Sequence, residues 1–164
     1  MTRSQLVLGP SQLNDLRTAL AQLGQQADVY LAMIADFSGQ DIVSWQNRHD
    51  LDTSSIAALA AGDMMATLEV GRMLGGKRAC NLIVQEHDEL TILIARVGEG
   101  LLLLLGTAKD VPLGWSRLAL KRTGDRILAV IGSAAPSAPP PALSDDFASS
   151  FAAQLDSIWG LYVY

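Results

Sequence analysis

The spacing of apolar residues predicts a helix followed by two strands in the first part of the chain. Leucines at helical spacing begin after Ser11, a suitable N-cap, and stop at Gly24, which predicts the first helix. Apolar side chains at nearly every position from 28 to 36 predict a strand covered on both faces, and 41–46 is typical of the return strand of a hairpin. One face of the first strand is expected to carry Val29, Leu31, Met33 and Ala35.

A long helix, three strands and another helix are predicted to follow. Asp52 and the three hydroxyl residues after it can open a helix that runs to about Leu74 and ends at two glycines. Short polar connectors then separate three strands, expected at roughly 79–86, 90–97 and 101–106. The next helix should begin near Asp110, with Pro112 in its first turn. Its apolar residues are Trp115, Leu118, Ile127, Leu128 and Ile131.

This order, α-ββ-α-βββ-α, predicts an α+β domain over residues 1–132, with a five-stranded antiparallel sheet and helices on both faces. Prolines at 133–143 predict a semi-rigid linker, and 144–164 should form a tethered amphipathic helix with an aromatic tail. The large apolar side chains of that segment need a cover, which we expect to be this chain, its dimer mate or a partner protein. The docking residues are Phe147, Phe151, Leu155, Ile158 and Trp159.

The helix from 53 to 74 lacks the polar face of an ordinary surface helix. Its apolar side chains fall on two opposite sides. After the three hydroxyl residues of its first turn, only four polar residues interrupt them, namely Asp63, Thr67, Glu69 and Arg72. Such a helix has to be covered twice, so we expect its own sheet on one side and a partner subunit on the other. Loops or the tethered helix are the alternative cover.

Composition narrows the class of protein. A net charge of −5 argues against general nucleic-acid binding. The single cysteine, Cys80, excludes an intramolecular disulfide and a cysteine-only zinc site. The most apolar run, 101–105, is far shorter than the roughly 20 residues of a membrane helix. The N-terminus also lacks the apolar stretch of a signal peptide. We therefore expect a soluble, cytoplasmic protein with no integral membrane segment.

Candidate chemistry is weak. The spacing G-x-x-x-x-G-K from Gly71 to Lys77 is that of a phosphate loop, but these glycines close a helix where such a loop would open one. A helix C-cap explains them better. His49 and His87 stand apart in polar loops, which is typical of solvated turn residues and not of metal ligands or acid–base groups. We expect no catalytic residue, no bound metal and no cofactor.

The last helix before the linker has a local excess of base. Five basic residues stand against two acidic ones: Lys109, Arg117, Lys121, Arg122 and Arg126 against Asp110 and Asp125. A solvated face is the default interpretation. The alternatives are a contact with the tail, whose charged residues Asp145, Asp146 and Asp156 are all acidic, or a weak contact with an anionic membrane.

Two segments together resemble the Roadblock family of domains. The first, LDTSSIAALAAG from Leu51 to Gly62, continues to Gly75 in the manner of that family's central helix. The second, IADFSGQDIVSW from Ile34 to Trp45, has the family's acidic residue, glycine turn and return strand. The resemblance covers about 15–131 and is nearest to bacterial members that partner Ras-like GTPases in gliding-motility polarity systems.

The resemblance implies a homodimer joined through the third strand and the central helices, with the two sheets made continuous. The dimer contact is then expected at Ala57, Ala58, Ala61, Gly62, Met65, Ala79, Asn81 and Ile83. It also implies that a small Ras-like GTPase docks, often on the surface formed by the paired helices. The partner-binding residues would be Asp63, Thr67, Glu69 and Arg72. If the protein accelerates GTP hydrolysis by supplying an arginine finger to the GTPase, Arg72 is the candidate residue. Acceleration without a supplied arginine is an equal alternative.

We therefore expect a non-catalytic, homodimeric regulator or scaffold of a small Ras-like GTPase, which stimulates GTP hydrolysis or localises the GTPase. The alternative is a small-molecule-binding sensor or signalling domain. Against it, the sequence shows no convergent polar groups among its core residues. An enzyme comes third, because no nucleophile, base or metal cluster stands out.

Overall fold

The computed structural model describes residues 7–26, 28–76 and 80–132 of the 164-residue chain. The chain separates into a unit of residues 1–134 and a unit of residues 135–164. The expected linker at 133–143 and the expected C-terminal helix at 144–164 lie outside the described residues.

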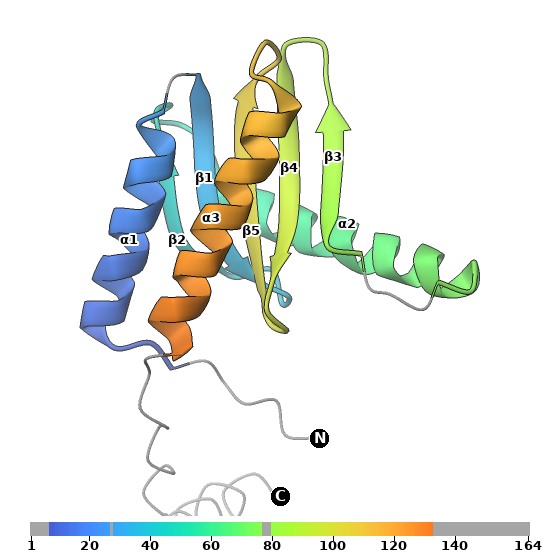
Figure 1. Cartoon of the computed structure of the whole chain (residues 1–164), viewed down its shortest axis with the longest axis horizontal. Coiled ribbons are helices and arrows are strands. Elements are labelled where there is room, and N and C mark those ends of the chain that lie inside the picture. The colour runs from blue at the N-terminus through green and yellow to red at the C-terminus, as the bar shows by residue number, and fades with distance from the viewer. Residues whose placement is uncertain (1–6, 27, 77–79, 133–164) are drawn as a thin grey trace, which may run out of the picture. The chain divides into compact units, whose positions relative to one another are not determined.

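Five antiparallel strands form one sheet in the order β2-β1-β5-β4-β3 (Figure 1). The strands are β1 (Val29–Asp36), β2 (Asp41–Gln46), β3 (Leu82–Glu86), β4 (Leu90–Val97) and β5 (Leu101–Ala108). β1 and β5 are buried along nearly their whole length, since apolar runs of this kind are covered on both faces. The predicted five-stranded antiparallel sheet is confirmed.

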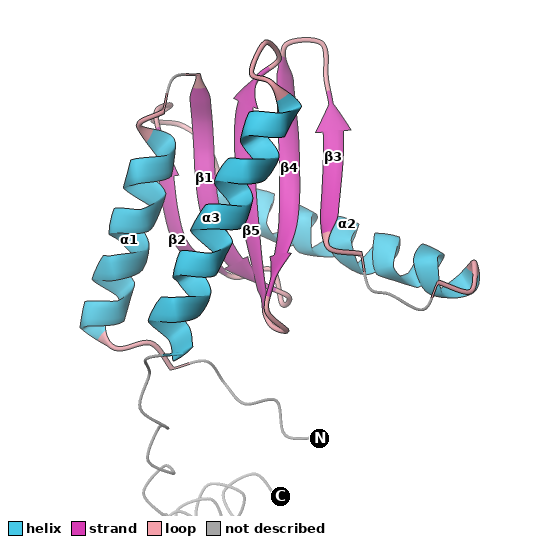
Figure 2. Ribbon diagram, in the orientation of Figure 1, coloured by secondary structure: helices cyan, strands magenta, loops and turns pink. Residues whose placement is uncertain are grey.

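Within the described residues, three helices cover the two faces of the sheet (Figure 2). α1 (Pro10–Gly24) and α3 (Leu113–Gly132) lie side by side on one face, and α2 (Thr53–Met73) crosses the other. The core on the α1 and α3 side includes Leu20, Leu103 and Ile127, and the core on the α2 side includes Met33, Met64 and Leu104. The predicted element order, with helices on both faces, is confirmed.

The β1–β2 turn fixes where the first half of α2 lies. Asp36 Oδ1 accepts hydrogen bonds from Ser38 N at 2.8 Å, Ser38 Oγ at 2.6 Å and Gln40 N at 3.0 Å. Gly39, at φ +85°, touches α2, where an added Cβ would come within 2.8 Å of Ala58 Cα. Only glycine combines this left-handed conformation with so close an approach.

α1 and α3 both begin at positions that differ from the predicted ones. Gly9, and not Ser11, occupies the N-cap position of α1, because the fixed φ of Pro10 suits the first helical residue. The Gly9 N–H donates to Gln12 Oε1 at 2.9 Å. α3 begins at Leu113, after Pro112, because the residue that precedes a proline disfavours the helical conformation.

Strand boundaries and one face assignment also needed correction. β3 begins at Leu82, later than the predicted 79, and β5 extends to Ala108 because that residue still pairs with Leu90 of β4. The register of β1 on β5 shifts between Val29 and Leu31. Val29 therefore packs in the core on the α1 and α3 side, away from Leu31 and its neighbours.

The apolar residues predicted for α3 divide between the core and the surface. Ile127 is fully buried, and Trp115 and Ile131 are half-buried against the core. Leu118 and Leu128 are exposed, because the buried stripe of the helix runs on its other side. That stripe consists of Ser116, Leu120, Thr123, Gly124 and Ile127.

Candidate interaction surface

The start of α2 is fixed by a side-chain cap. Asp52 Oδ1 accepts from Ser55 N at 3.1 Å, and Ser55 Oγ donates to Asp52 Oδ2 at 2.6 Å. The Ser55 hydroxyl and its backbone N–H favour the charged carboxylate and lower the pKa of Asp52. The predicted opening of this helix at Asp52 is confirmed.

One side of α2 packs on the sheet of its own chain. The buried positions follow the i, i+3, i+4, i+7 spacing of a helix face, and they are Ala57, Ala60, Ala61 and Met64. Ile56 and Leu68 are half-buried beside them. Ala57 and Ala61 were expected in the dimer contact, but they are 0% and 4% exposed within their own chain, so they are unavailable to a partner.

The opposite side of α2 is apolar and exposed, and we call it the outer face. It consists of Ala58, Leu59, Gly62, Met65, Ala66, Val70, Met73 and Leu74. Leu59 is 71% exposed, Met65 is 52% exposed and Met73 is 75% exposed. No described residue covers these side chains, and a contiguous exposed patch of this kind marks an interaction site.

The outer face lies beside the open edge of the sheet. Figure 1 shows α2 crossing behind the sheet and extending past β3, and no residue of α2 after Met64 is buried. β3 is an edge strand, with β4 as its neighbour on one side. Ile83 is half-buried on the α2 side of β3, and Asn81 is exposed just before it. Ala79 lies outside the described residues.

The four polar residues of α2 that were expected to bind a partner are placed differently from one another. Asp63 Oδ2 accepts from Gln85 Nε2 of β3 at 2.7 Å, and Thr67 is half-buried. Glu69 and Arg72 form a two-bond ion pair at 2.9 and 2.5 Å, and both side chains are exposed. This pair lowers the pKa of Glu69 and raises that of Arg72, because each charge stabilises the other.

The glycines after α2 close the helix, as predicted. Gly75, at φ +78°, donates its N–H to Arg72 O at 3.1 Å, and Gly76 N–H donates to Gly71 O at 2.9 Å. These N–H groups are therefore bonded within the turn and do not point outward to receive a phosphate, as the N–H groups of a phosphate loop do. His49 and His87 are exposed and far apart in the chain. Among the described residues, no group of three or more acidic, histidine or cysteine side chains could hold a metal.

The expected tail residues Phe147, Phe151, Leu155, Ile158 and Trp159 lie outside the part of the chain that the structure describes. Within that part, no helix is both long and apolar enough to cross a membrane.

Sequence reasoning missed how the outer face is composed. The expected dimer contact at Ala57, Ala58, Ala61, Gly62 and Met65 cuts across the real division, because Ala57 and Ala61 belong to the buried stripe that also contains Ala60 and Met64. A search for the best i, i+3, i+4, i+7 stripe of small residues would have found the inner side, since small residues allow α2 to approach the sheet closely.

The sequence matches no protein-family model and no curated protein. Solved structures with the same fold include the following three. MglB of Myxococcus xanthus has a TM-score of 0.73 and 22% identity, over 81% of this chain and 100% of that chain. The gliding protein MglB of Thermus thermophilus has a TM-score of 0.72 and 21% identity, over 81% and 100%. A Roadblock/LC7 domain from Streptomyces avermitilis has a TM-score of 0.57 and 17% identity, over 71% and 92%.

These likenesses establish the fold of the chain, which is that of MglB and of Roadblock/LC7 domains. The resemblance to Roadblock domains that the hairpin and the central helix indicated is confirmed at this level.

Proposed function

We propose that the protein is a homodimeric regulator or scaffold, without catalytic activity of its own, that binds a small Ras-like GTPase. The uncovered outer face of α2 carries this proposal. Leu59, Met65, Val70, Met73 and Leu74 are all more than half exposed in the single chain. Burial of such side chains contributes about 1.5–3 kcal/mol each, so leaving them in water is costly.

A second copy of the chain is the proposed cover for most of this face. The second half of α2 and the free edge of β3 lie at the same side of the sheet. Two copies related by a two-fold axis would pair β3 with β3 and bury the outer faces of both α2 helices together. Gly62 and Ala58 are exposed on this face and small enough for close helix–helix contact. The proposed contact residues are Ala58, Gly62, Met65, Asn81 and Ile83, together with Ala79 from outside the described residues.

A Ras-like GTPase is the proposed client. The Roadblock resemblance of the hairpin and central helix implies such a partner, and the fold is that of the gliding protein MglB. The part of the two α2 helices that the second copy leaves exposed would present apolar groups beside charged ones, which suits a partner surface with both apolar and polar groups. The bordering residues are Asp63, Thr67, Glu69 and Arg72. We propose that they select the partner, while apolar contacts supply most of the affinity.

Two measurements on the whole chain test the two parts of the proposal. Sedimentation at micromolar concentration should give twice the mass of one chain. The mass of a single chain would contradict the proposed dimer. The Ras-like GTPase encoded nearest to this gene, loaded with a non-hydrolysable GTP analogue or with GDP, should bind in one of the two nucleotide states. If the GTPase binds in neither nucleotide state, the proposal that it is the partner is contradicted.

A further inference from the structure

A groove of about 340 Å³ runs between α1 and α3, on the face of the sheet opposite α2 (Figure 1). Its floor is apolar, with Ala19 and Leu23 from α1 and Ala119 from α3. Trp115 and Leu118 of α3 add large apolar side chains to the lining. Leu118 is 47% exposed and Trp115 is half-buried, so both still present apolar surface to a partner.

The exposed rims of this groove are polar and basic. Gln22 and Gln26 stand one helical turn apart on α1, and Arg122 and Arg126 stand one turn apart on α3. Arg126 donates to Gln22, which is neutral, so the charge of Arg126 is not compensated. Arg122 forms no hydrogen bond or ion pair with any described residue. None of the described residues that line the groove is acidic, so both positive charges are open to a partner.

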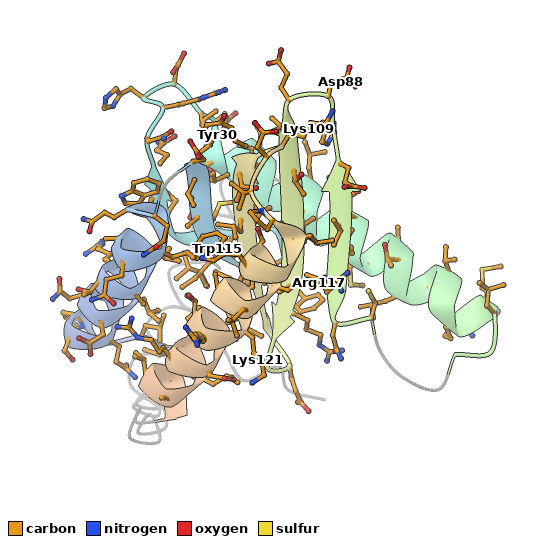
Figure 3. All side chains as sticks on the ribbon, turned by 45° about the horizontal axis from the view of Figure 1, so that its top comes forward. Tyr30, Asp88, Lys109, Trp115, Arg117 and Lys121 are labelled. Carbon is orange, nitrogen blue, oxygen red and sulfur yellow. The ribbon has the colours of Figure 1, made fainter. Side chains whose placement is uncertain are left out.

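The other side of α3 has a different charge balance. Arg117 and Lys121 lie on that side, away from α1 (Figure 3). Asp125 lies there too and pairs with Lys121 at 3.1 Å. Leu128 is 44% exposed on that side, much as Leu118 is on the side of α1. The far side of α3 therefore offers matched basic and apolar positions as controls.

The layer of α1 and α3 is the positive part of an acidic protein. These two helices carry five basic and two acidic residues, whereas the other described residues carry four basic and twelve acidic ones. Complementary charge steers a partner to a surface and fixes its register. A partner for the groove is therefore acidic, and the apolar floor requires that it also supplies apolar side chains.

A helix fits this surface better than a membrane does. A surface that lies on a membrane needs large apolar side chains on its outermost side. α1 instead presents exposed polar side chains, among them Asn14, Thr18 and Gln25, and no exposed large apolar one. A helix laid between two helices brings an apolar stripe to the floor while its flank reaches the arginines. Tryptophan and arginine, which line the groove, are also enriched where the binding energy of interfaces is concentrated.

We propose that the groove between α1 and α3 binds an acidic amphipathic helix of a second protein. The apolar stripe of that helix contacts Trp115, Leu118 and Ala119, and carboxylates on its flank pair with Arg122 and Arg126. Since α2 lies on the opposite face of the sheet, the groove and the outer face of α2 can be occupied at the same time. The protein then acts as an adaptor that holds two partners. Binding in the groove does not depend on the GTPase or on the dimer.

Fluorescence anisotropy with a synthetic helix tests the groove in the full-length chain. The probe is a labelled peptide of leucine, alanine and glutamate whose leucines form one stripe at helical spacing. The control peptide has the same composition, with the leucines distributed around the helix. At physiological salt, the striped peptide should bind at least about tenfold more tightly than the control. Equal affinities, or no saturation by the striped peptide up to about 1 mM, would overturn the proposal.

Charge reversal on the two sides of α3 locates the bound peptide. R122E with R126E should weaken binding of the striped peptide at least about tenfold. R117E with K121E makes the same change of charge on the far side of α3 and should alter the affinity less than about twofold, because salt screens distant charges. Equal weakening by both variants would reduce the attraction to overall charge and overturn the assignment.

A charge swap and an apolar pair complete the mapping. A striped peptide with lysine in place of glutamate should bind the variant with R122E and R126E more tightly than it binds the unsubstituted chain, and no such reversal would contradict direct pairing. L118A should weaken binding of the acidic peptide, and L128A should not; equal effects would place the apolar stripe elsewhere. M65D, on the outer face of α2, should leave this binding unchanged, so loss of the dimer and loss of the groove are distinguishable.

Vesicles distinguish a lipid surface from a protein partner. With vesicles of phosphatidylglycerol and phosphatidylcholine in equal parts, the full-length chain should stay in the supernatant at physiological salt. Co-sedimentation that R122E with R126E abolishes would assign the groove to an anionic membrane and overturn the proposed helix.

Discussion

Gly24, the last residue of α1, lies so close against the indole ring of Trp45 on β2 that a Cβ on residue 24 would overlap the ring carbons Cε3 and Cδ2. Trp45 is half-buried and packs against the core on the α1 and α3 side. The sequence indicated Gly24 as the end of a helix, and the helix does end there. The structure adds that glycine is required at this position by the ring.

G24A is therefore expected to destabilise the protein, because the indole ring must move. Overpacking of this kind costs about 1–3 kcal/mol in the free energy of unfolding. Urea denaturation would measure it, and G114A is the control, since Gly114 is helical with no atom within 4 Å of an added Cβ. In a W45L background the cost should shrink. A G24A protein as stable as G114A would show that the ring adjusts freely.

G39A should loosen the attachment of α2 as well as strain the turn. The left-handed φ disfavours a side chain, and the new methyl group would press on the α2 backbone at Ala58. We expect a loss of at least about 2 kcal/mol, the sum of a backbone term and a packing term. G100A, in another hairpin turn with open space around the added Cβ, is the control. The melting midpoints of the two variants measure this difference. Equal midpoints would contradict a close contact between residue 39 and Ala58.

Asp36 should give the protein a component of acid sensitivity. Burial alone would raise the pKa of its carboxyl, but hydrogen bonds from the Ser38 hydroxyl and from the N–H groups of Gln40, Ser38 and Gly39 lower the pKa below the ordinary 3.8. This stabilisation is present above about pH 3.8 and is lost as the pH falls through the lower, folded-state value.

D36N should reduce the free energy of unfolding at pH 7 by about 1 kcal/mol, because neutral acceptors bond more weakly than charged ones. The difference from the unsubstituted protein should narrow between pH 4 and pH 2. Asp88, whose side chain accepts no hydrogen bond from the described residues, supplies the matched D88N control. A difference that stays constant with pH would argue against the turn as its source.

M65D should weaken the proposed dimer without unfolding the chain. Met65 is 52% exposed on the outer face of α2, so a charge there is tolerated in the single chain but is desolvated in a contact. We expect the dimer dissociation constant to rise at least about tenfold in sedimentation equilibrium. L118D, at a leucine 47% exposed on α3, should leave the mass unchanged. If both variants behave alike, the contact lies elsewhere.

R72A is expected to leave dimer mass and melting temperature unchanged, because its ion pair with Glu69 is exposed. Where the GTPase partner hydrolyses GTP faster with this protein, we also expect the acceleration to persist within about twofold, since Glu69 holds the guanidinium in place. A supplied arginine finger is worth about a thousandfold or more, so a loss of that size would reassign Arg72 to the reaction. E69A, which frees Arg72, is the companion variant.

Local pattern was sufficient for the order of elements and for the strand count. The continuous apolar run of β1 and the leucine spacing of α1 indicate buried side chains, and the residues at Asp52 indicate a helix cap whose hydrogen bonds form within a few residues. Such signals survive without knowledge of the rest of the chain. The all-round apolar character of α2 was visible for the same reason, and it pointed to an interaction surface.

Only the tertiary structure decided which side of α2 faces the sheet. A helix with apolar residues on all sides has no polar face to orient it, so Ala57 and Ala61 were assigned to a partner although they contact their own sheet. The contacts of Gly24 with Trp45 and of Gly39 with Ala58 join separate elements, which no local period records. The spacing of apolar residues along the chain indicates that a side chain is buried. The packing of segments that are distant in the sequence determines which residues bury it.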